Sequence, residues 1–427
     1  MDIKTLNTAT QCVQAGYTPE NGEPRIAPLV QSTTYKYDDA DQVADLFDLK
    51  AAGHMYSRIS NPTCGVLEEK VTILEGGVGA IATSSGQSAI MMSILNIASA
   101  GDHILAMSNL YGGTSNLFKS QLKKLGISFS FADPNLPLED LEKYIFPNTK
   151  AVYGETIGNP ALGILDFEKI STLAHEAGIP LIIDNTFATP HLCRPFEHGA
   201  DIIVHSTTKY LDGHAACVGG LIVDGGNFNW ANGKFPEFTT PDPSYHGLVY
   251  VDAFEAAAYI AKARVTLLRD MGCTMSPFNA WLTNVGTETL AVRMDKHCAN
   301  ALAVAKHLKA HKMVDWVIYP GLEGDTSYEL AQKYLPNGAS GIISFGVHGG
   351  AEAGKQLINN VKLASLVVHV GDLRTHILHP SSMTHRQLSL EDQLAAGVLP
   401  DMVRLSVGIE NVEDIIADID QALANIN

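Results

Sequence analysis

A single lysine, Lys209, follows an apolar stretch and lies in a turn of small hydroxyl residues, VHSTTKYLDGH. Four roles are compatible with this position. The side chain can lie along the surface and place its ammonium group in water. Ser206 to Lys209 also fit the SxxK pattern of certain serine hydrolases, with Ser206 as nucleophile. The remaining roles are a phosphate-binding lysine and a lysine that forms a Schiff base with a carbonyl cofactor.

The surrounding sequence argues against two of these roles. An SxxK hydrolase needs its serine at a helix start and a later KTG motif, whereas Ser206 ends a predicted strand and no KTG occurs. A GxxxxGKS phosphate loop is also absent from the sequence. The Schiff-base role with pyridoxal phosphate makes further demands. It needs an acid for the pyridine nitrogen, donors for a phosphate dianion and a flat group against the ring.

Residues that meet these demands occur where predicted strands end. Asp184 ends the apolar stretch PLIID and can hold a ring nitrogen protonated, and Tyr111 in NLYGGT can stack on a ring. Each residue alone also fits an ordinary structural role, as a turn former, a helix cap or a packing aromatic. Backbone and hydroxyl donors for a phosphate are expected at a helix start and in the lysine turn, from Ser85, Gly86, Gln87, Ser206 and Thr208.

The elements that position these residues alternate along the chain from residue 61 onwards. Apolar strands without polar alternation are predicted at AIATSS, HILAMS, ISFSFAD, AVYGET, PLIIDN and DIIVHS, with helical segments between them. This pattern predicts an α/β fold with a mostly parallel sheet and helices on both faces. Ligands bind beyond the carboxyl ends of the strands in such sheets, which is where the candidate residues lie.

The chain is predicted to have three parts. Residues 1–60 show weak periodicity and are predicted to form an arm that contacts a neighbouring subunit. Residues 61–285 form the large domain, with a loop insertion rich in Gly, Pro and aromatic residues at about 225–250. Residues 286–427 form a smaller C-terminal α/β domain, with strands expected at WVIYP, IISFGV and LVVHVG before a closing helix.

Composition excludes several classes of partner. The 427 residues carry a net charge of −17, which argues against binding nucleic acid or anionic membranes. No apolar run reaches the roughly 18 residues of a membrane span, and the polar N-terminus lacks a signal-peptide core, so a cytoplasmic location is expected. Six scattered cysteines form no CxxC pair. No metal site is predicted, because tight ligand spacing is lacking in the cluster His369, His376, His379 and His385.

The sequence also resembles the Cys/Met-metabolism family of pyridoxal phosphate enzymes over essentially its whole length. This resemblance implies the type I, aspartate aminotransferase-like fold of pyridoxal phosphate-dependent transferases. It is carried by ordered blocks, YSRISNPT (56–63), SSGQSA (84–89), NLYGGT (109–114), ETIGNP (155–160), IIDNTFATP (182–190), HSTTKYLDGH (205–214), RMDKHCANA (293–301) and VRLSVGIE (403–410).

The resemblance also implies roles for single residues. Lys209 would carry pyridoxal 5'-phosphate as a Schiff base, Asp184 would bind the pyridine nitrogen, and Tyr111 would stack on the ring and assist as an acid or base. The phosphate would be held by the donors named above. Tyr56 and Arg58 would reach the phosphate of the neighbouring subunit, Tyr56 also contacting substrate, so a homotetramer built from dimers is expected. The substrate α-carboxylate would lie near Arg404 and Asn159.

Two features indicate a branch of the family. Gly113 stands where methionine γ-lyases have the Cys of a YGC motif, and the insertion FPEFTTPDPSYHGL (235–248) resembles that of O-acetylhomoserine sulfhydrylases. MTH at 383–385 departs from the TTH of many sulfhydrylases.

The branch implies γ-replacement on O-acetyl-L-homoserine by sulfide or a small thiol, which yields L-homocysteine or methionine and acetate. Methionine γ-lyase and cystathionine γ-synthase are alternatives within the family, and an SxxK serine hydrolase or a non-catalytic scaffold outside it. The sequence leaves open the preferred ester and the sulfur donor.

Overall fold

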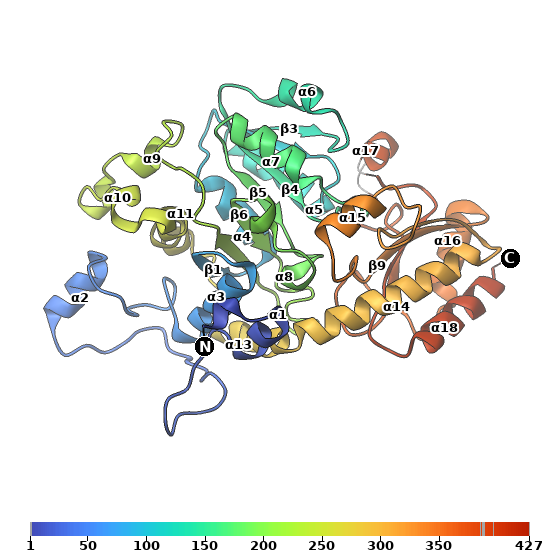
Figure 1. Cartoon of the computed structure of the whole chain (residues 1–427), viewed down its shortest axis with the longest axis horizontal. Coiled ribbons are helices and arrows are strands. Elements are labelled where there is room, and N and C mark those ends of the chain that lie inside the picture. The colour runs from blue at the N-terminus through green and yellow to red at the C-terminus, as the bar shows by residue number, and fades with distance from the viewer. Residues whose placement is uncertain (1, 385, 387–388, 396, 427) are drawn as a thin grey trace.

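Two β-sheets organise the chain in the computed structural model, which describes residues 2–384, 386, 389–395 and 397–426. The larger sheet has the strand order β1-β7-β6-β5-β4-β2-β3 and the smaller one β10-β11-β12-β9-β8 (Figure 1). The larger sheet consists of β1 (Gly79–Thr83), β2 (His103–Met107), β3 (Ser128–Ala132), β4 (Thr149–Glu155), β5 (Leu181–Asp184), β6 (Ile202–His205) and β7 (Gly220–Asp224).

The large sheet is mostly parallel, as the apolar strand pattern predicts. Strands β2 to β6 pair in parallel, and β7 alone runs antiparallel to its neighbours β1 and β6. The prediction from sequence missed β7, because its five residues follow a glycine-rich turn and directly precede the insertion. Every residue of β7 is buried. Pairing with two strands that lie far away in the sequence, rather than a local signal, makes this segment a strand.

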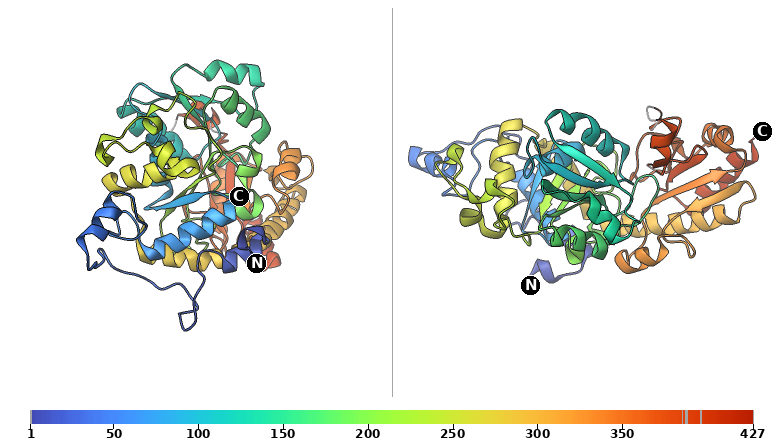
Figure 2. Two further views of the ribbon diagram at one scale, coloured as in Figure 1. Left: turned by 60° about the vertical axis from the view of Figure 1, so that its left-hand side comes forward. Right: turned by 90° about the horizontal axis from the view of Figure 1, so that it is seen from above.

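Helices cover both faces of the large sheet (Figure 2). Helix α3 (Pro62–Glu75) begins as its sequence predicts, with Asn61 accepting a hydrogen bond from the backbone of Thr63 and proline in the first turn. It ends at Gly76, whose φ of 80° suits glycine. Helix α4 (Gly86–Leu95) follows β1 directly and packs against β6 and β7. Helix α7 (Phe167–Glu176) connects β4 to β5.

The smaller sheet is mostly antiparallel, since only β10 and β11 pair in parallel. It contains β8 (Val314–Ile318), β9 (Ile342–Val347), β10 (Ser365–Leu366), β11 (His376–Leu378) and β12 (Met402–Ser406). The strand expected at 366–371 is wrong beyond Leu366, and β11 and β12 were not predicted. These short segments become strands because β12 lies between β9 and β11 in the sheet.

Two long helices connect the parts of the chain. The helical stretch expected after the insertion is two helices, α13 (Pro277–Glu288) and α14 (Leu290–Ala310), which meet at Thr289. The predicted boundary at residue 286 falls within the last turn of α13. Figure 1 shows α14 running from the large sheet's domain to the smaller one, where it packs with α18 (Val412–Ala424) and β8. Helix α16 (Gly350–Asn360) covers β9 and β12.

The N-terminal segment does not behave as one arm. Helix α1 (Thr8–Gln14) packs against α3, α13 and α14 of its own chain, and Cys12 is fully buried. This corrects the prediction for the first fifteen residues. Residues 17–60 contain the short helix α2 (Ala40–Phe47) and one isolated bridge, Thr34 to Tyr56. Figure 1 shows α2 projecting from the body of the molecule, so the predicted contact with a neighbour now applies to residues 17–60.

The insertion at 225–250 has a core of its own. It contains the one-turn helix α9 (Pro236–Thr239), and its aromatic residues Trp230, Phe235 and Phe238 are buried. The Trp230 ring stacks on Phe238 and on Tyr259, with ring centres 4.7 and 5.1 Å apart. The aromatic residues that mark this segment as a loop in the sequence therefore anchor it to the large domain.

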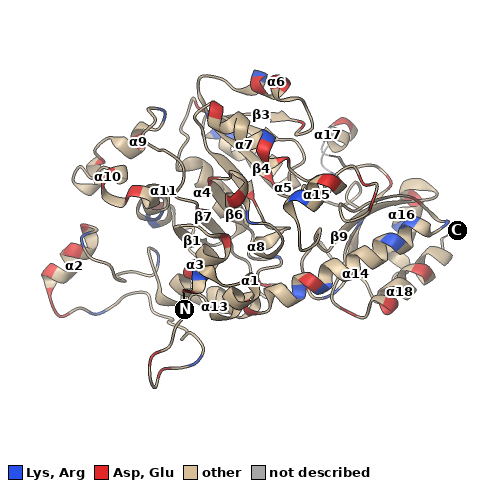
Figure 3. Cartoon of the chain, viewed as in Figure 1, with Lys and Arg blue, Asp and Glu red and all other residues tan. Residues whose placement is uncertain are grey.

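Charge, hydrophobicity, cysteines and metal ligands bear on the other predictions made from composition. Acidic side chains outnumber basic ones, and Figure 3 shows both kinds dispersed over the elements. No helix among the described residues combines the length and apolar character that crossing a bilayer requires. All six cysteines are free thiols. The described residues contain no cluster suited to a metal ion, and His385, with the end of the MTH motif, lies outside them.

A buried polar cluster lies beneath the carboxyl ends of β5 and β6. His205 Nε2 and Glu75 Oε1 are 2.6 Å apart, and both side chains are inaccessible to solvent. Asn185 Nδ2 donates to the same Glu75 oxygen at 2.9 Å, and Asn185 Oδ1 accepts a hydrogen bond from the Thr156 hydroxyl at 2.7 Å. The cluster ties α3 to the strands that carry Asp184 and Lys209.

Replacing Glu75 with Leu is expected to lower the free energy of unfolding by roughly 3 kcal/mol or more, because two buried donors lose their acceptor. Chemical denaturation of the purified variant measures the loss. Glu69→Leu is the matched control, since Glu69 is an exposed residue of the same helix, and we expect a change of only about 0.5 kcal/mol. Similar losses in the two variants would contradict a stabilising role for the cluster.

Candidate active site

The candidate residues converge where β4, β5 and β6 end. Glu155 and Asp184 are paired residues at the ends of adjacent parallel strands. The lysine turn follows β6 directly. Parallel strands bring their carboxyl ends to one edge of a sheet. The strand ends that carry the candidate residues therefore lie side by side at one edge of the sheet, as predicted.

Lys209 lies in a tight turn held by backbone hydrogen bonds. Its N–H donates to the Ser206 carbonyl at 3.2 Å, and its own carbonyl accepts from Gly213 at 2.7 Å. The side chain is partly buried, and Nζ lies 3.3 Å from Nδ1 of His369. Burial, and then the positive charge of Arg404, lower the pKa of Lys209 to about 8. A substantial fraction of this amine is therefore neutral near pH 8, the form that attacks a carbonyl carbon.

Asp184 ends β5 and faces the same site. One of its oxygens accepts a hydrogen bond from the Thr186 N–H at 3.0 Å. Burial raises the pKa of Asp184, while the bonds from Thr186 and the charge of His205 oppose the rise. A carboxylate that has lost its water gains most from a cationic partner. A protonated pyridine nitrogen is such a partner, so Asp184 suits the role predicted for it.

The start of α4 provides a cradle for a phosphate. The first N–H groups of a helix have no partner within the helix. The Ser85 hydroxyl accepts from the Ser88 N–H at 3.1 Å and lies 2.9 Å from the Ser88 hydroxyl. Gly86 allows the turn of Lys209 to approach, since a β-carbon there would lie 2.7 Å from Cβ of Ser206. Gln87 Oε1 is buried without a hydrogen-bond partner in the part of the chain that the structure describes, and exchanging the two amide atoms would present Nε2 to a phosphate as a donor. These features fit the phosphate of pyridoxal phosphate.

The two hydroxyl residues of the lysine turn, Ser206 and Thr208, make different hydrogen bonds. Thr208 Oγ1 donates to the Gly219 carbonyl at 3.2 Å and accepts from the Gly219 N–H at 3.1 Å. Ser206 uses its backbone N–H, which donates to the Thr186 hydroxyl at 2.8 Å. Thr208 must therefore turn its hydroxyl proton away from Gly219 to donate to a phosphate, and its role as a phosphate ligand stays a prediction.

Tyr111 is held beside this cradle. Its backbone N–H donates to Glu155 Oε1 at 2.6 Å, and its side chain is 48% exposed, which leaves a face free for a ligand. Burial and the nearby Asp184 raise the pKa of Glu155 well above its usual range. A β-carbon at position 113 would lie 2.4 Å from the Tyr111 ring and 2.6 Å from Gln87 Nε2. Glycine at 113 therefore allows the ring to lie over the backbone next to the phosphate cradle.

Gly113→Cys is expected to displace the Tyr111 ring and to lower kcat/KM about tenfold, because small displacements of positioning groups are costly. Steady-state kinetics with O-acetylhomoserine and sulfide measure the effect. Gly65→Cys serves as the control, since a β-carbon there meets nothing within 4 Å. An unchanged kcat/KM in Gly113→Cys would show that the ring does not depend on this glycine.

Arg404 and Asn159 come together from distant parts of the chain. Arg404 Nη1 donates to Asn159 Oδ1 at 2.8 Å, and both side chains are more than nine-tenths buried. Burial lowers the pKa of Arg404 to about 10, but the guanidinium stays charged at neutral pH. Arg404 lies on β12 of the smaller sheet, so the site lies between the two sheets. A buried cation with donors to spare suits a substrate carboxylate.

Tyr56 and Arg58 lie elsewhere. They line a hollow of about 410 Å³ together with residues of the 17–60 segment and Arg269. The Arg58 guanidinium lies over the Tyr56 ring at 5.3 Å and donates to the Arg269 carbonyl. Among the described residues, no hydrogen bond, ion pair or ring contact joins this pair to Lys209. Their predicted role at a neighbouring subunit stays a prediction.

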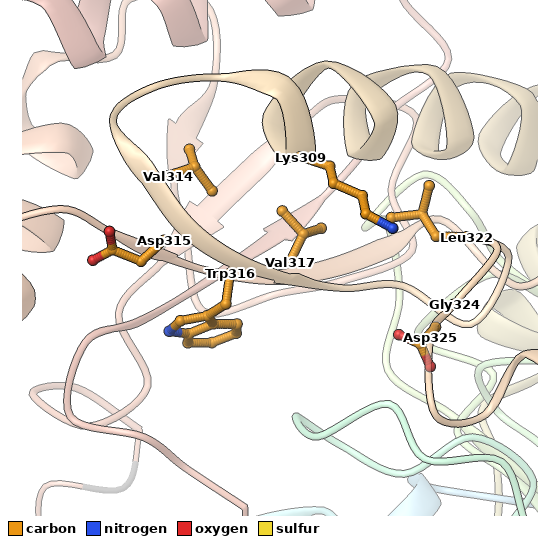
Figure 4. A pocket seen from close by; sticks show the side chains of 8 residues that line it. All are labelled: Lys309, Val314, Asp315, Trp316, Val317, Leu322, Gly324 and Asp325. Atoms are coloured by element: carbon orange, nitrogen blue, oxygen red, sulfur yellow. The ribbon is translucent and has the colours of Figure 1, made fainter.

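A second cavity, of about 270 Å³, lies against the outer strand of the smaller sheet (Figure 4). Figure 4 shows Lys309 reaching from α14 over β8 towards Leu322. None of the residues predicted for the site lines this cavity.

Two residues of the site were missed in the sequence. Glu155 lies at the end of the predicted strand AVYGET, and its bond to the Tyr111 backbone depends on how that strand pairs in the sheet. His369 was considered only within a histidine cluster, although it touches the amine of Lys209 from 160 residues away. The VVHVG segment carries no pattern that could reveal such a contact.

Comparison with known proteins agrees with this geometry. Residues 9–424 match the model of the Cys/Met metabolism PLP-dependent enzyme family. The chain is 49% identical to an O-acetyl-L-homoserine sulfhydrylase of Leptospira meyeri, covering 94% of this chain and 93% of that protein. It is 46% identical to a homocysteine synthase of Schizosaccharomyces pombe, covering 99% of each.

A solved structure from Campylobacter jejuni, described as an O-acetylhomoserine (thiol)-lyase, superimposes with a TM-score of 0.95 at 38% identity. The match covers 98% of this chain and all of that one, which contains a pyridoxyl-lysine monophosphate residue. The family match and these full-length similarities place the chain in the Cys/Met metabolism family of PLP-dependent enzymes.

Proposed function

We propose that the protein is an O-acetylhomoserine sulfhydrylase, which replaces the acetoxy group of O-acetyl-L-homoserine with sulfide and releases L-homocysteine and acetate. The full-length similarity to sulfhydrylases and homocysteine synthases carries this proposal. The site supports it with a lysine of lowered pKa between a strand-end carboxylate and a buried arginine.

The residues of the chain take the following parts. Arg404 binds the substrate α-carboxylate, and Asn159 holds the guanidinium in place by its bond to Nη1. Pyridoxal phosphate, when bound, supplies an electron-accepting ring, which Asp184 keeps protonated at the pyridine nitrogen. Its phosphate would be held at the start of α4 by Ser85, Gly86, Gln87, Ser206 and Thr208.

Lys209 is the group that moves protons. Its Nζ takes the proton from Cα of the substrate and then exchanges protons at Cβ. Acetate leaves from Cγ with the bonding electron pair, sulfide forms the new bond at Cγ, and the protons return to Cβ and Cα. Tyr111, with its ring beside the phosphate cradle, orients the reacting atoms and assists as an acid or base.

We further propose that the enzyme is an oligomer of paired subunits, a homotetramer in its final form, located in the cytoplasm. The segment 17–60 supports the pairing, because it projects from the body and exposes large apolar side chains such as Phe47, 59% exposed. Tyr56 and Arg58 of this segment would complete the phosphate site of the partner. Sedimentation velocity of the native protein and of a variant lacking residues 17–50 tests the pairing.

Product analysis tests the proposed function against its rivals. The purified protein is incubated with O-acetylhomoserine, with and without sulfide. We expect homocysteine and acetate only when sulfide is present. An α-keto acid and ammonia without sulfide would instead identify a γ-lyase. Cystathionine formed from added cysteine, at a rate above that with sulfide, would identify a cystathionine γ-synthase.

A further inference from the structure

A series of side chains leads from Lys209 to a buried carboxylate. Lys209 Nζ is 3.3 Å from His369 Nδ1. The rings of His369 and His376 have centres 5.7 Å apart, and His376 Nε2 lies 3.2 Å from Asp372 Oδ2. Arg374 Nη1 donates to both oxygens of Asp372, at 3.0 and 2.9 Å. Apart from Lys209, none of these residues has a part in the reaction proposed above.

The donors and acceptors of this series are complementary. Below its pKa the amine of Lys209 is an ammonium group that can only donate, so His369 Nδ1 must accept and His369 Nε2 must carry the proton. The carboxylate of Asp372 accepts from His376 Nε2, which leaves a lone pair on His376 Nδ1. These two remaining nitrogens, His369 Nε2 and His376 Nδ1, are buried and have no partner within the described residues. One is a donor and the other an acceptor, so a water molecule that bridged them would complete one series of hydrogen bonds.

The charges around His369 keep its imidazole neutral, as the series of hydrogen bonds requires. Burial, then the positive charge of Lys209, lower the pKa of His369 to about 4. Arg404 acts in the same direction, and Asp372 opposes it. At neutral pH the imidazole therefore offers a lone pair rather than a second cation next to the amine.

The backbone around His369 is packed onto the lysine turn. Gly371 has a φ of 76°, and a β-carbon there would lie 2.9 Å from the backbone nitrogen of Tyr210. The Leu373 N–H donates to the Gly213 carbonyl at 3.1 Å. His369 is therefore held against Lys209 by its own segment.

We propose that His369 is a positioning residue for Lys209, and that His376 and Asp372 hold it in the tautomer that accepts a hydrogen bond at Nδ1. This inference rests on the part given to Lys209 in the proposed function. The free amine of Lys209 must move protons first at Cα and then at Cβ of the substrate. A fixed acceptor keeps Nζ between them, whereas an amine without this partner would swing away from the reacting atoms.

A matched pair of variants tests the geometry. Asn places its carbonyl oxygen close to where His has Nδ1, and Gln places it close to Nε2. We expect His369→Asn to keep kcat within about threefold of native, and His369→Gln to lower kcat about tenfold or more with little change in KM. Both residues are polar and suit a partly exposed position. Equal losses in the two variants, or no loss in either, would overturn the proposal.

The apoprotein provides a readout that does not depend on turnover. Competitive acetylation at a series of pH values, followed by peptide mass spectrometry, reports the pKa of Lys209. A hydrogen bond to the charged amine favours that form, so we expect the pKa of Lys209 to fall in His369→Gln and to stay native in His369→Asn. Lys262, whose pKa burial also lowers to about 8, is the internal reference. An unchanged Lys209 pKa in His369→Gln would overturn the inference, whether or not the enzyme forms homocysteine.

The part of His376 is tested by combining variants. If His376 acts through His369, His376→Gln lowers kcat in the native background and has no further effect in His369→Gln. If the losses in kcat simply add in the double variant, His376 and Asp372 do not act through His369, and that part of the proposal is wrong.

Discussion

Replacing Lys209 with Ala is expected to abolish homocysteine formation and the visible absorption of the lysine-bound cofactor. The variant loses both the amine that binds the cofactor carbonyl and the group that moves protons at Cα and Cβ. We expect kcat to fall at least about 1,000-fold. Absorbance spectra of the purified variant and single-turnover assays measure the two losses separately.

The matched control for this variant is Lys262→Met. Burial lowers the pKa of Lys262 to about 8, as it does for Lys209, but the Lys262 ammonium donates to the Asn96 carbonyl at 2.8 Å and takes no part in the site. We expect native absorbance and native turnover in this control. A Lys209→Ala protein that kept near-normal activity and the same absorption band would refute the role of Lys209.

Arg404→Leu has the second largest expected effect, a loss of about 100-fold in kcat/KM. The variant lacks the buried cation that pairs with the substrate carboxylate, an interaction of the strength of a bidentate, charge-assisted hydrogen bond. It also lacks a positive charge that helps to lower the pKa of Lys209. The pKa of Lys209 should therefore rise above about 8, and the acid limb of the pH profile should move to higher pH.

Arg404→Lys separates these two effects. A lysine keeps the positive charge but cannot bind a carboxylate with two parallel N–H groups. We expect a raised KM with the acid limb at its native position. An acid limb that moved equally in the Lys and Leu variants would mean that the charge of Arg404 does not act on Lys209.

Much of the large domain could be predicted from local sequence. Asn61, Pro62 and Gly76 mark both ends of α3 through capping and backbone preference, which need no tertiary contact. The apolar strands β4, β5 and β6 follow one another in the sheet, so the polar residues after them were bound to meet. The sequence alone therefore predicts that Asp184 and Lys209 lie at the same edge of the sheet.

Strands β7, β11 and β12 and the packing of α1 could not be predicted in this way, although β8, β9 and the closing helix α18 could. Strands β7 and β12 are short, and each pairs with strands distant in sequence. Helix α1 packs on its own chain, with Gln11 and Cys12 buried, because α3, α13 and α14 present a surface to it. The polar N-terminal sequence does not reveal that surface.

The amino-acid sequence by itself determined the parallel sheet, the edge at which the candidate residues lie, and the residue types suited to a phosphate, a ring nitrogen and a carbonyl carbon. Periodicity, helix caps and strand ends are local properties, and they suffice for these features. Only the tertiary structure decided which distant side chains contact the residues at that edge. Arg404 meets Asn159 across 245 residues and His369 meets Lys209 across 160, because the second sheet packs against the carboxyl ends of the first. Those contacts set the charge and position of the amine, and they depend on the packing of the whole chain.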